Sequence, residues 1–190
     1  MNLSLQQHAQ TLLSRYLQVF PDETPAMAHL QQQLQGPADC FVRSNMDGHV
    51  TCSAAVLSPD LSQVLLIHHK FLDKWLPPGG HYEEPGDLWA SAVREVEEET
   101  GVSGLTLHPW CVENRVPLDI DTHAVPANPA KGEGEHWHHD VRFLAVANSL
   151  SKLVPQAAEV LGARWAPLDE LKYAQDRRLQ TLARKLRTLL

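Results

Sequence analysis

Four glutamates fall within five consecutive positions of this chain, in the run EVEEE at residues 95 to 99. Like charges three or four residues apart on a helix repel one another by a few tenths of a kcal/mol. Asp87 is a suitable N-cap and Gly101 a suitable terminating residue, so the spacing predicts a helix over residues 87 to 100. A chain that keeps carboxylates crowded on such a helix is expected to use them.

The carboxylates are predicted to share one side of this helix. At about 100° per residue, Glu95, Glu98 and Glu99 occupy an arc about 100° wide. A different arc carries residues suited to packing, namely Trp89, Val93, Val96 and Thr100. Oxygen-only clusters of this kind bind hard cations such as Mg²⁺ or Mn²⁺, which also remove the repulsion. The helix alone favours a plainer alternative, a solvated acidic face paired with lysines.

The segment before the helix favours a cation site over a solvated acidic face. Residues 77 to 80 read Pro-Pro-Gly-Gly, a rigid entry followed by two residues that allow the main chain to approach a metal or phosphate closely. Arg94 lies four residues before Glu98 and can hold that carboxylate in place. Loop, helix and carboxylates together predict a binding site.

This stretch resembles the Nudix box, Gly-x5-Glu-x7-Arg-Glu-U-x-Glu-Glu-x-Gly-U, where U is aliphatic. Gly80 is followed at the family's spacing by the run REVEEETGV at residues 94 to 102, which matches at every specified position. One position departs, because Gly86 stands where the family has its first glutamate. Asp87 next to it, or Glu84 before it, could take over the support that this position gives to the loop and helix.

The resemblance implies a metal-dependent pyrophosphohydrolase. Its metal ligands would be Glu95, Glu98, Glu99 and the backbone carbonyl of Gly79, with Arg94 as the orienting partner and Mg²⁺ (or Mn²⁺) as the cofactor. Its substrate would be a small molecule, a nucleoside diphosphate linked to another moiety, or a similar diphosphate. Catalysis would rest on Glu98, Glu99 and Arg94. The alternative is a catalytically silent nucleotide-binding or regulatory module with the same fold.

The general base varies between members of that family. A carboxylate near the metal is the natural choice. The candidates are Glu98, Glu99, Glu133, Glu135 and Glu159.

The fold implied by the resemblance is an α/β/α sandwich around a mixed sheet, with residues 41 to 190 as the Nudix hydrolase domain. Helices at 4 to 20 and 25 to 35 form an N-terminal helical extension over residues 1 to 40, whose apolar stripes are covered by the domain or by a second copy in a homodimer. Strands are expected at 50 to 56, 63 to 68, 105 to 112, 137 to 147 and 164 to 168, with an acidic loop at 124 to 136.

A histidine-rich stretch at residues 136 to 140 lies outside the box. In a strand, His138, Asp140 and Arg142 share one face and could bind substrate. A zinc site from His68, His69, His81 and His136 to His139 would follow the manner of isopentenyl diphosphate isomerases, which share the Nudix fold. Those enzymes combine a catalytic cysteine with a degenerate box, whereas here the box is full. Candidates for stacking on a base are Trp75, Trp110, Trp137 and Tyr82.

Composition agrees with a cytoplasmic enzyme. The chain has 190 residues, 43% hydrophobic, and its sequence offers neither a membrane-spanning run nor a signal peptide. Three cysteines without CxxC spacing indicate free thiols. The net charge is −7, but residues 172 to 190 are basic and the first 171 residues carry −12. The basic segment has helical apolar spacing and is interpreted as a packed surface helix, so nucleic acid is not expected as a partner.

Overall fold

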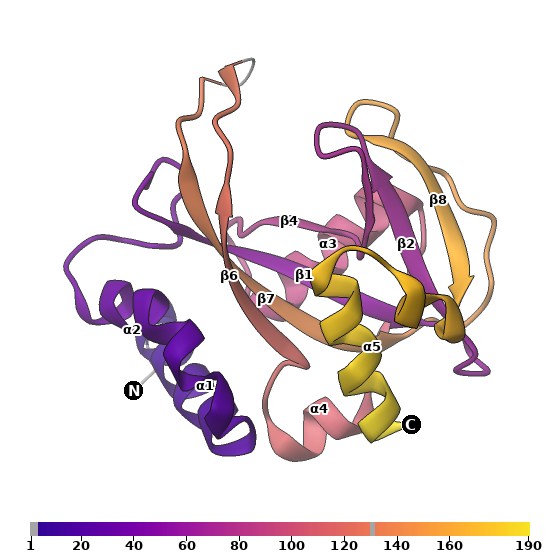
Figure 1. Ribbon diagram of the computed structural model, residues 1–190, viewed down its shortest axis with the longest axis horizontal. Coiled ribbons are helices and arrows are strands. Elements are labelled where there is room, and N and C mark those ends of the chain that lie inside the picture. The colour runs from indigo at the N-terminus through magenta and orange to yellow at the C-terminus, as the bar shows by residue number, and fades with distance from the viewer. Residues whose placement is uncertain (1–3, 130–131) are drawn as a thin grey trace.

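The computed structural model describes residues 4 to 129 and 132 to 190 as one mixed sheet with helices on both faces (Figure 1). The first three residues of the N-terminal extension, and residues 130 and 131 of the acidic loop, lie outside the described residues. The helices are α1 (Leu5–Val19), η1 (Pro21–Met27), α2 (Ala28–Gln35), α3 (Leu88–Thr100), α4 (Pro109–Asn114), η3 (Leu168–Tyr173) and α5 (Arg177–Leu189). The strands are β1 (His49–Leu57), β2 (Gln63–His69), β3 (Lys74–Leu76), β4 (Gly79–His81), β5 (Thr106–Leu107), β6 (Asp119–Val125), β7 (His136–Val146) and β8 (Val160–Pro167).

The sheet is built around β1 and β7, which run parallel from the pair His49 and His138 to the pair Leu57 and Val146. All its other strand pairs are antiparallel. The main path is β3-β2-β1-β7-β5, while β4 pairs with β1, β6 with β7, and β8 with β2. The hairpin expected between the first two strands is present, since Leu57 pairs with Val64.

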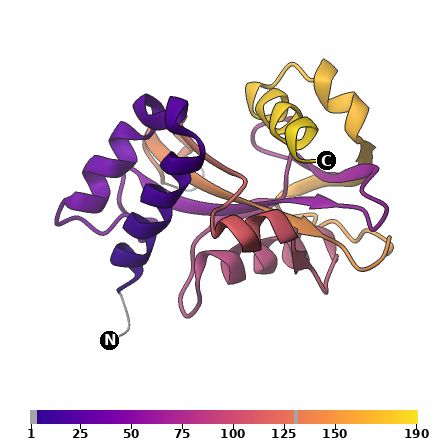
Figure 2. The same cartoon turned by 90° about the horizontal axis from the view of Figure 1, so that it is seen from below.

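Every residue of β1 is buried. A strand with one wet face would alternate apolar and polar residues, whereas β1 is covered on both faces. Figure 2 shows the reason, because α3 lies against one face of the sheet and α5 against the other. The expected α/β/α sandwich around a mixed sheet is therefore confirmed.

Helix α3 begins and ends where the sequence predicts. The Asp87 side chain accepts a hydrogen bond from the Ala90 N–H at 2.8 Å, which caps the first turn. Gly101 has φ 74°, a left-handed conformation that glycine adopts without strain. Leu88, Ala92 and Val96 are buried in the core on the side of the helix that faces β1 and β7.

The N-terminal helices pack onto the same core as the sheet. Ser4 and Gln7 form the predicted capping box at the start of α1. The second helix begins at Ala28 rather than at 25, because residues 21 to 27 form a 3-10 helix that contains Pro25. The buried apolar residues of this segment belong to the main core cluster; they are Ala9, Leu13, Tyr16, Met27, Leu30 and Leu34. Within this chain the apolar stripes are thus covered by the domain.

The strand expected at 105 to 112 is wrong. Only Thr106 and Leu107 are extended, and α4 follows, starting with Pro109 at its first position. His108 caps that helix by accepting a hydrogen bond from the Trp110 N–H at 3.2 Å. Strand β6 is an addition to the expected elements, and the acidic loop expected from residue 124 begins after Val125.

Helix α5 is the predicted amphipathic helix of the basic C-terminal segment. Leu179, Leu182 and Leu186 are buried in a second apolar cluster with residues of β1, β2 and β8. Lys185 is also buried, at 6% exposure, which the prediction of a solvated basic face did not include. Among the described residues, no helix has both the length and the apolar character needed to cross a membrane.

Candidate active site

Strand β4 brings its two glycines against the carboxylates of α3. The Gly79 N–H donates a hydrogen bond to Glu99 Oε2 at 2.9 Å. A Cβ on Gly79 would collide with the Ser53 side chain and backbone, and one on Gly80 would lie 2.5 Å from the Glu95 carboxylate. The absence of side chains at both positions is therefore what allows strand and helix to approach this closely.

Arg94 fastens the carboxylates to the same strand. Its guanidinium lies 2.9 Å from Glu95 Oε1 and 2.9 Å from Glu98 Oε2, and it donates a hydrogen bond to the His81 carbonyl at 2.9 Å. A longer contact of 3.8 Å reaches the exposed Glu83. One arginine thus holds two of the three carboxylates at fixed positions beside β4.

The three carboxylates differ in exposure. Glu99 is 3% exposed. The Glu95 side chain is 12% exposed and that of Glu98 50%. Burial raises the pKa of Glu99 to about 8, against the hydrogen bond from Gly79. Burial likewise raises the pKa of Glu95 to about 7, although Arg94 opposes this. Arg94 supplies one positive charge for three carboxylates, and a divalent cation is a further partner that their oxygens fit.

The departure at the first box position has a local explanation. Asp87 uses its carboxylate to cap α3. The Gly86 carbonyl accepts a hydrogen bond from the Tyr82 hydroxyl at 2.9 Å, and Tyr82 is buried against Phe41. The loop and the start of the helix are thus fixed by a cap and a buried tyrosine, while Glu84 is exposed.

A cavity of about 1240 Å³ opens beside the three carboxylates. Glu95, Glu98 and Glu99 all line it, whereas Glu97 is exposed and does not belong to its described lining. Besides Arg94 and Arg142, its lining includes cationic residues that sequence reasoning did not place there, mostly from α5; they are Arg43, Lys74, Arg177, Arg178 and Arg184. The cavity therefore combines an acidic side suited to a cation with arginines suited to phosphate oxygens.

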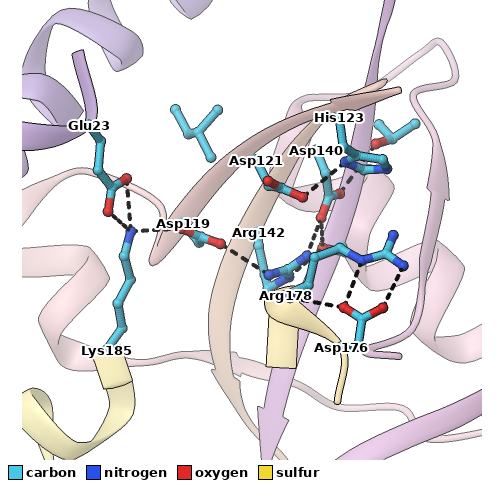
Figure 3. Close-up of polar contacts among 12 residues, drawn as sticks. Glu23, Asp119, Asp121, His123, Asp140, Arg142, Asp176, Arg178 and Lys185 are labelled. Atoms are coloured by element: carbon cyan, nitrogen blue, oxygen red, sulfur yellow. Dashed lines mark hydrogen bonds and ion pairs between the residues drawn. The ribbon is translucent and has the colours of Figure 1, made fainter. Parts of the chain in front are cut away.

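Asp140 and Arg142 lie at the wall of this cavity but are engaged with protein groups (Figure 3). The Arg142 guanidinium contacts Asp140 at 2.8 Å and Asp119 at 3.1 Å, and the Arg142 side chain is 3% exposed. Asp140 also accepts a hydrogen bond from the Ser53 hydroxyl at 2.7 Å. Buried charges paired in this way fix the positions of β1, β6 and β7 relative to one another.

Asp119 links that pair to the N-terminal helices. Its Oδ1 atom lies 2.7 Å from Lys185 Nζ, which also lies 2.9 Å from Glu23 (Figure 3). The Tyr16 hydroxyl accepts a hydrogen bond from Lys185 at 2.6 Å and contacts Glu23. Sequence reasoning missed this network, although Lys185 falls three residues after Leu182 on the apolar side of α5.

The histidine-rich strand divides as its alternation predicts. His138 lines the cavity on the same side as Asp140 and Arg142. His139 is fully buried on the other side, where its Nε2 lies 2.7 Å from the Gln33 side-chain oxygen and its Nδ1 3.0 Å from the Thr122 hydroxyl. Burial and the neighbouring imidazole of His29 lower the pKa of His139 to about 3.

The candidate general bases differ in their position relative to the cavity. Glu98, Glu99, Glu133 and Glu159 line the cavity, whereas Glu135 does not belong to its described lining. The Glu133 carboxylate is held by Arg43 at 2.6 Å, in the turn between β6 and β7. After burial, the charges of Glu95, Glu159 and Glu98 raise the pKa of Glu99, so Glu98 and Glu159 are the candidate bases that lie near it.

A sandwich of this topology, with a two-glycine strand against an acidic helix, defines the Nudix class of proteins. The family model described as NUDIX domain matches residues 48 to 187 of this chain. The chain therefore belongs to the NUDIX family.

Curated relatives match part of their own length. A probable DHNTP pyrophosphohydrolase of Lactococcus lactis subsp. cremoris (strain MG1363) is 30% identical over 100 residues, 53% of this chain and 55% of that protein. The m7GpppN-mRNA hydrolase NUDT17 of Bos taurus is 35% identical over 97 residues, 48% of this chain and 30% of that protein. The matched region thus spans about half or less of these relatives.

Solved structures share the fold. A C. elegans Ap4A hydrolase in a binary complex has a TM-score of 0.55 and 23% identity, covering 74% of this chain and 96% of that chain. The NUDIX domain of Shewanella oneidensis NrtR, complexed with ADP ribose, has a TM-score of 0.50 and 22% identity, covering 83% of this chain and 96% of that chain.

Proposed function

We propose that this protein is a metal-dependent hydrolase that cleaves the pyrophosphate bond of a nucleoside diphosphate linked to another moiety. One observation carries the proposal. Three carboxylates of α3, two of them largely buried, meet the backbone of β4 at a cavity whose lining also includes three arginines of α5. A diphosphate with a bound cation is a ligand that suits both parts of such a cavity.

The residues present fit Mg²⁺ or Mn²⁺. The donors on α3 are all carboxylate oxygens, and Arg94 is the cation that contacts Glu95 and Glu98, so three carboxylates share one positive side chain. Glu95, Glu98, Glu99 and the Gly79 carbonyl would hold the ion. When bound, such an ion neutralises diphosphate oxygens and lowers the pKa of a water.

The protein's own groups divide the remaining work. Arg94 keeps Glu95 and Glu98 oriented and also fixes β4 through the His81 carbonyl. Arg177 and Arg184 would bind phosphate oxygens on the basic side of the cavity, whereas Arg178 is already paired with Asp176 at 3.2 Å. The proton of the attacking water would pass to Glu98, Glu99 or Glu159.

The proposed substrate class rests on the cavity and on the relatives. A volume of about 1240 Å³ accommodates a molecule larger than a single phosphate group. Trp137 is 42% exposed and lines the cavity, so of the four candidate aromatic residues it is the one placed to stack on a base. The relatives' names, which include DHNTP pyrophosphohydrolase and Ap4A hydrolase, point to nucleotide-like diphosphates.

The proposed substrate-binding residues His138, Asp140 and Arg142 all line the cavity, but they would act differently. Asp140 and Arg142 already bind one another and Asp119, so they would shape the cavity wall without contributing unpaired groups. His138 would be the member of this face that contacts a ligand.

The test is a hydrolysis assay on a panel of nucleotide sugars, dinucleoside polyphosphates, NADH, ADP-ribose, coenzyme A and nucleoside triphosphates. Each compound is incubated with Mg²⁺ or Mn²⁺ and, in parallel, with EDTA. Metal-dependent release of a product with a terminal phosphate, from at least one compound, is the expected result. Full turnover in EDTA would refute the metal dependence.

A silent nucleotide-binding module is the second candidate, favoured by the glycine at the first box position. In the structure the cap by Asp87 and the Tyr82–Gly86 hydrogen bond preserve the local geometry. Saturable binding of a panel compound without turnover in any divalent metal would establish the silent module instead.

A further inference from the structure

Five histidines from four strands meet beside the carboxylate site. They come from β1, β4, β6 and β7 and are His49, His81, His123, His136 and His138. One ring nitrogen from each of His49, His81 and His138 can be chosen so that all three lie within 4.8 Å of one another. Nitrogens that share one tetrahedral Zn²⁺ lie about 3.4 Å apart, given Zn–N distances of about 2.1 Å, so small movements of the rings would let all three bind one ion.

Strand register brings these rings together. His49 and His138 are direct partners in the parallel β1–β7 pair, and His138 and His123 are partners across β7 and β6. His81 ends β4, which lies on the other side of β1 and pairs with it at Thr51. Three paired strands therefore carry the imidazoles, and strands hold side chains more rigidly than loops do.

The hydrogen bonds of His49 fix which of its nitrogens is available. Its Nδ1 lies 3.0 Å from the Asn45 carbonyl, and a carbonyl can only accept, so Nδ1 carries the proton. Nε2 then holds a lone pair. The ring is fully buried, and Nε2 has no hydrogen-bond partner among the described residues. A buried acceptor without a donor is costly unless something positive reaches it.

Hydrogen bonds also fix the protons of His136 and His138. His136 Nδ1 lies 2.7 Å from the Gly134 carbonyl and must donate, which leaves a lone pair on His136 Nε2. That atom lies 3.0 Å from His138 Nε2, which therefore donates to it. The remaining nitrogen of His138, Nδ1, then carries a lone pair. Metal-binding histidines are oriented in this way, with the second nitrogen donating to a neighbouring acceptor.

We propose that His49, His81 and His138 bind a first-row transition metal ion of the Zn²⁺ type, at a site separate from the carboxylates of α3. Nitrogen donors select this class of ion over Mg²⁺, which prefers oxygen. Three protein ligands leave a fourth position open, as in catalytic zinc sites.

The fourth position of this ion would face the cavity. His81 and His138 line the cavity, so an ion on them would sit at its wall. Three neutral ligands leave the dication's charge uncompensated, which favours an anionic oxygen as the fourth ligand. A phosphate oxygen or hydroxide is that kind of ligand. The His81 carbonyl is also bound by Arg94, so the two sites share strand β4.

The experiment uses full-length protein without a polyhistidine tag. The protein is stripped with EDTA, dialysed against Zn²⁺ with Mg²⁺ in large excess, desalted, and analysed for metal by mass spectrometry. About one equivalent of tightly bound Zn²⁺ is expected, from the single three-histidine site. Co²⁺ substituted for Zn²⁺ should give visible absorption bands of an ordered, low-coordinate nitrogen site.

Variants locate the ion. His49→Gln and His138→Gln should each lose the bound Zn²⁺ and the Co²⁺ bands, with circular dichroism reporting that the fold persists. His68→Gln is the matched control, because His68 stacks on Trp75 and pairs with Asp73 outside the cluster. Glu98→Gln is the second control and should retain Zn²⁺, since its carboxylate belongs to the other site.

Several outcomes would overturn the proposal. They are a parent protein that retains no Zn²⁺, equal Zn²⁺ retention in the parent and in both folded histidine variants, and loss of Zn²⁺ in Glu98→Gln. X-ray absorption of the Zn²⁺-loaded parent decides the matter even if the histidine variants fail to fold. Imidazole scattering around zinc is expected, and a shell of carboxylate oxygens alone would refute the site.

Discussion

The Gly79 N–H donates its hydrogen bond to the carboxylate of Glu99, 20 residues further along the chain, at 2.9 Å. This contact joins strand β4 to the last turn of α3, next to the left-handed Gly101 that ends the helix. Because Glu99 is buried, the hydrogen bond also fixes the direction of the carboxylate that faces the cavity. The relative position of two backbone segments thus sets the position of a proposed metal ligand.

Gly79→Ala should disrupt this relationship. A Cβ there would meet the backbone of Ser53 and the Cys52 carbonyl, which cannot rotate away, so β4 must shift. Overpacking of this kind costs about 1 to 3 kcal/mol, and we expect that loss in the unfolding free energy measured by urea titration. Metal-dependent turnover should fall as well. Gly134→Ala is the matched control, since a Cβ there meets no described atom within 4 Å. Equal stability of the two variants would contradict the argument.

Three isosteric substitutions on α3 test the direction in which the carboxylates face. Glu98→Gln and Glu99→Gln should each lower kcat by about 10² or more, a loss of roughly 2.7 kcal/mol of transition-state stabilisation. Glu97→Gln makes the same chemical change at an exposed position outside the described cavity lining and should leave kcat within a few-fold of the parent. The measurement is steady-state kinetics with the substrate found by the panel. Similar damage from all three would indicate that bulk acidity, not the cavity-facing set, matters.

The sequence predicts well those features of the site that depend on residues close together in the chain. Asp87, Gly101 and the glutamate spacing define a helix from contacts within a few residues of one another, and the structure places that helix within one residue of the expected bounds. The preceding glycines likewise identify the close approach of β4. The strand expected at 105 to 112 failed because His108 caps a helix, so the chain turns into α4 after Leu107.

The missed residues depend on contacts between distant segments. Lys185 is buried because Asp119 and Glu23 meet it from β6 and from the segment after α1, which no spacing within α5 encodes. His49 was not recognised as a candidate ligand because its neighbours His81 and His138 come from two other strands. Only the register of the sheet brings these rings together.

Metal-free protein should lose stability as the pH rises from 6.5 to 8. The folded-state pKa of Glu99 is raised to about 8 and that of Glu95 to about 7, so the folded protein holds protons that the unfolded chain has already released. Stability falls with pH wherever the folded protein holds more protons than the unfolded chain, and the fall levels off above the raised pKa values. The buried histidines act in the opposite direction but only below about pH 6.5, where an unfolded histidine gains its proton.

Thermal melts in EDTA across this range are the measurement. The decline should be shallower in Glu99→Gln, which cannot ionise. Mg²⁺ should raise the melting temperature more at pH 8 than at pH 6.5, because it requires deprotonated ligands. A Mg²⁺ shift that is independent of pH would argue against these carboxylates as the ligands.

Lys185→Met should destabilise the protein strongly, although it lies on a helix with a basic surface. The ammonium group lies 2.7 Å from Asp119 and 2.9 Å from Glu23, so its removal leaves buried carboxylates with fewer positive partners. Breaking a buried ion pair by removing one member costs about 3 to 5 kcal/mol. Because Lys185 also donates to the Tyr16 hydroxyl, the same change should loosen α1 from the domain and increase cleavage of the N-terminal segment by protease.

Arg184→Met is the control on the adjacent exposed position, where surface substitutions usually stay within about 0.5 kcal/mol. Urea titration and limited proteolysis of both variants are the measurements, and equal behaviour of the two would show that the buried network does not secure the N-terminal helices.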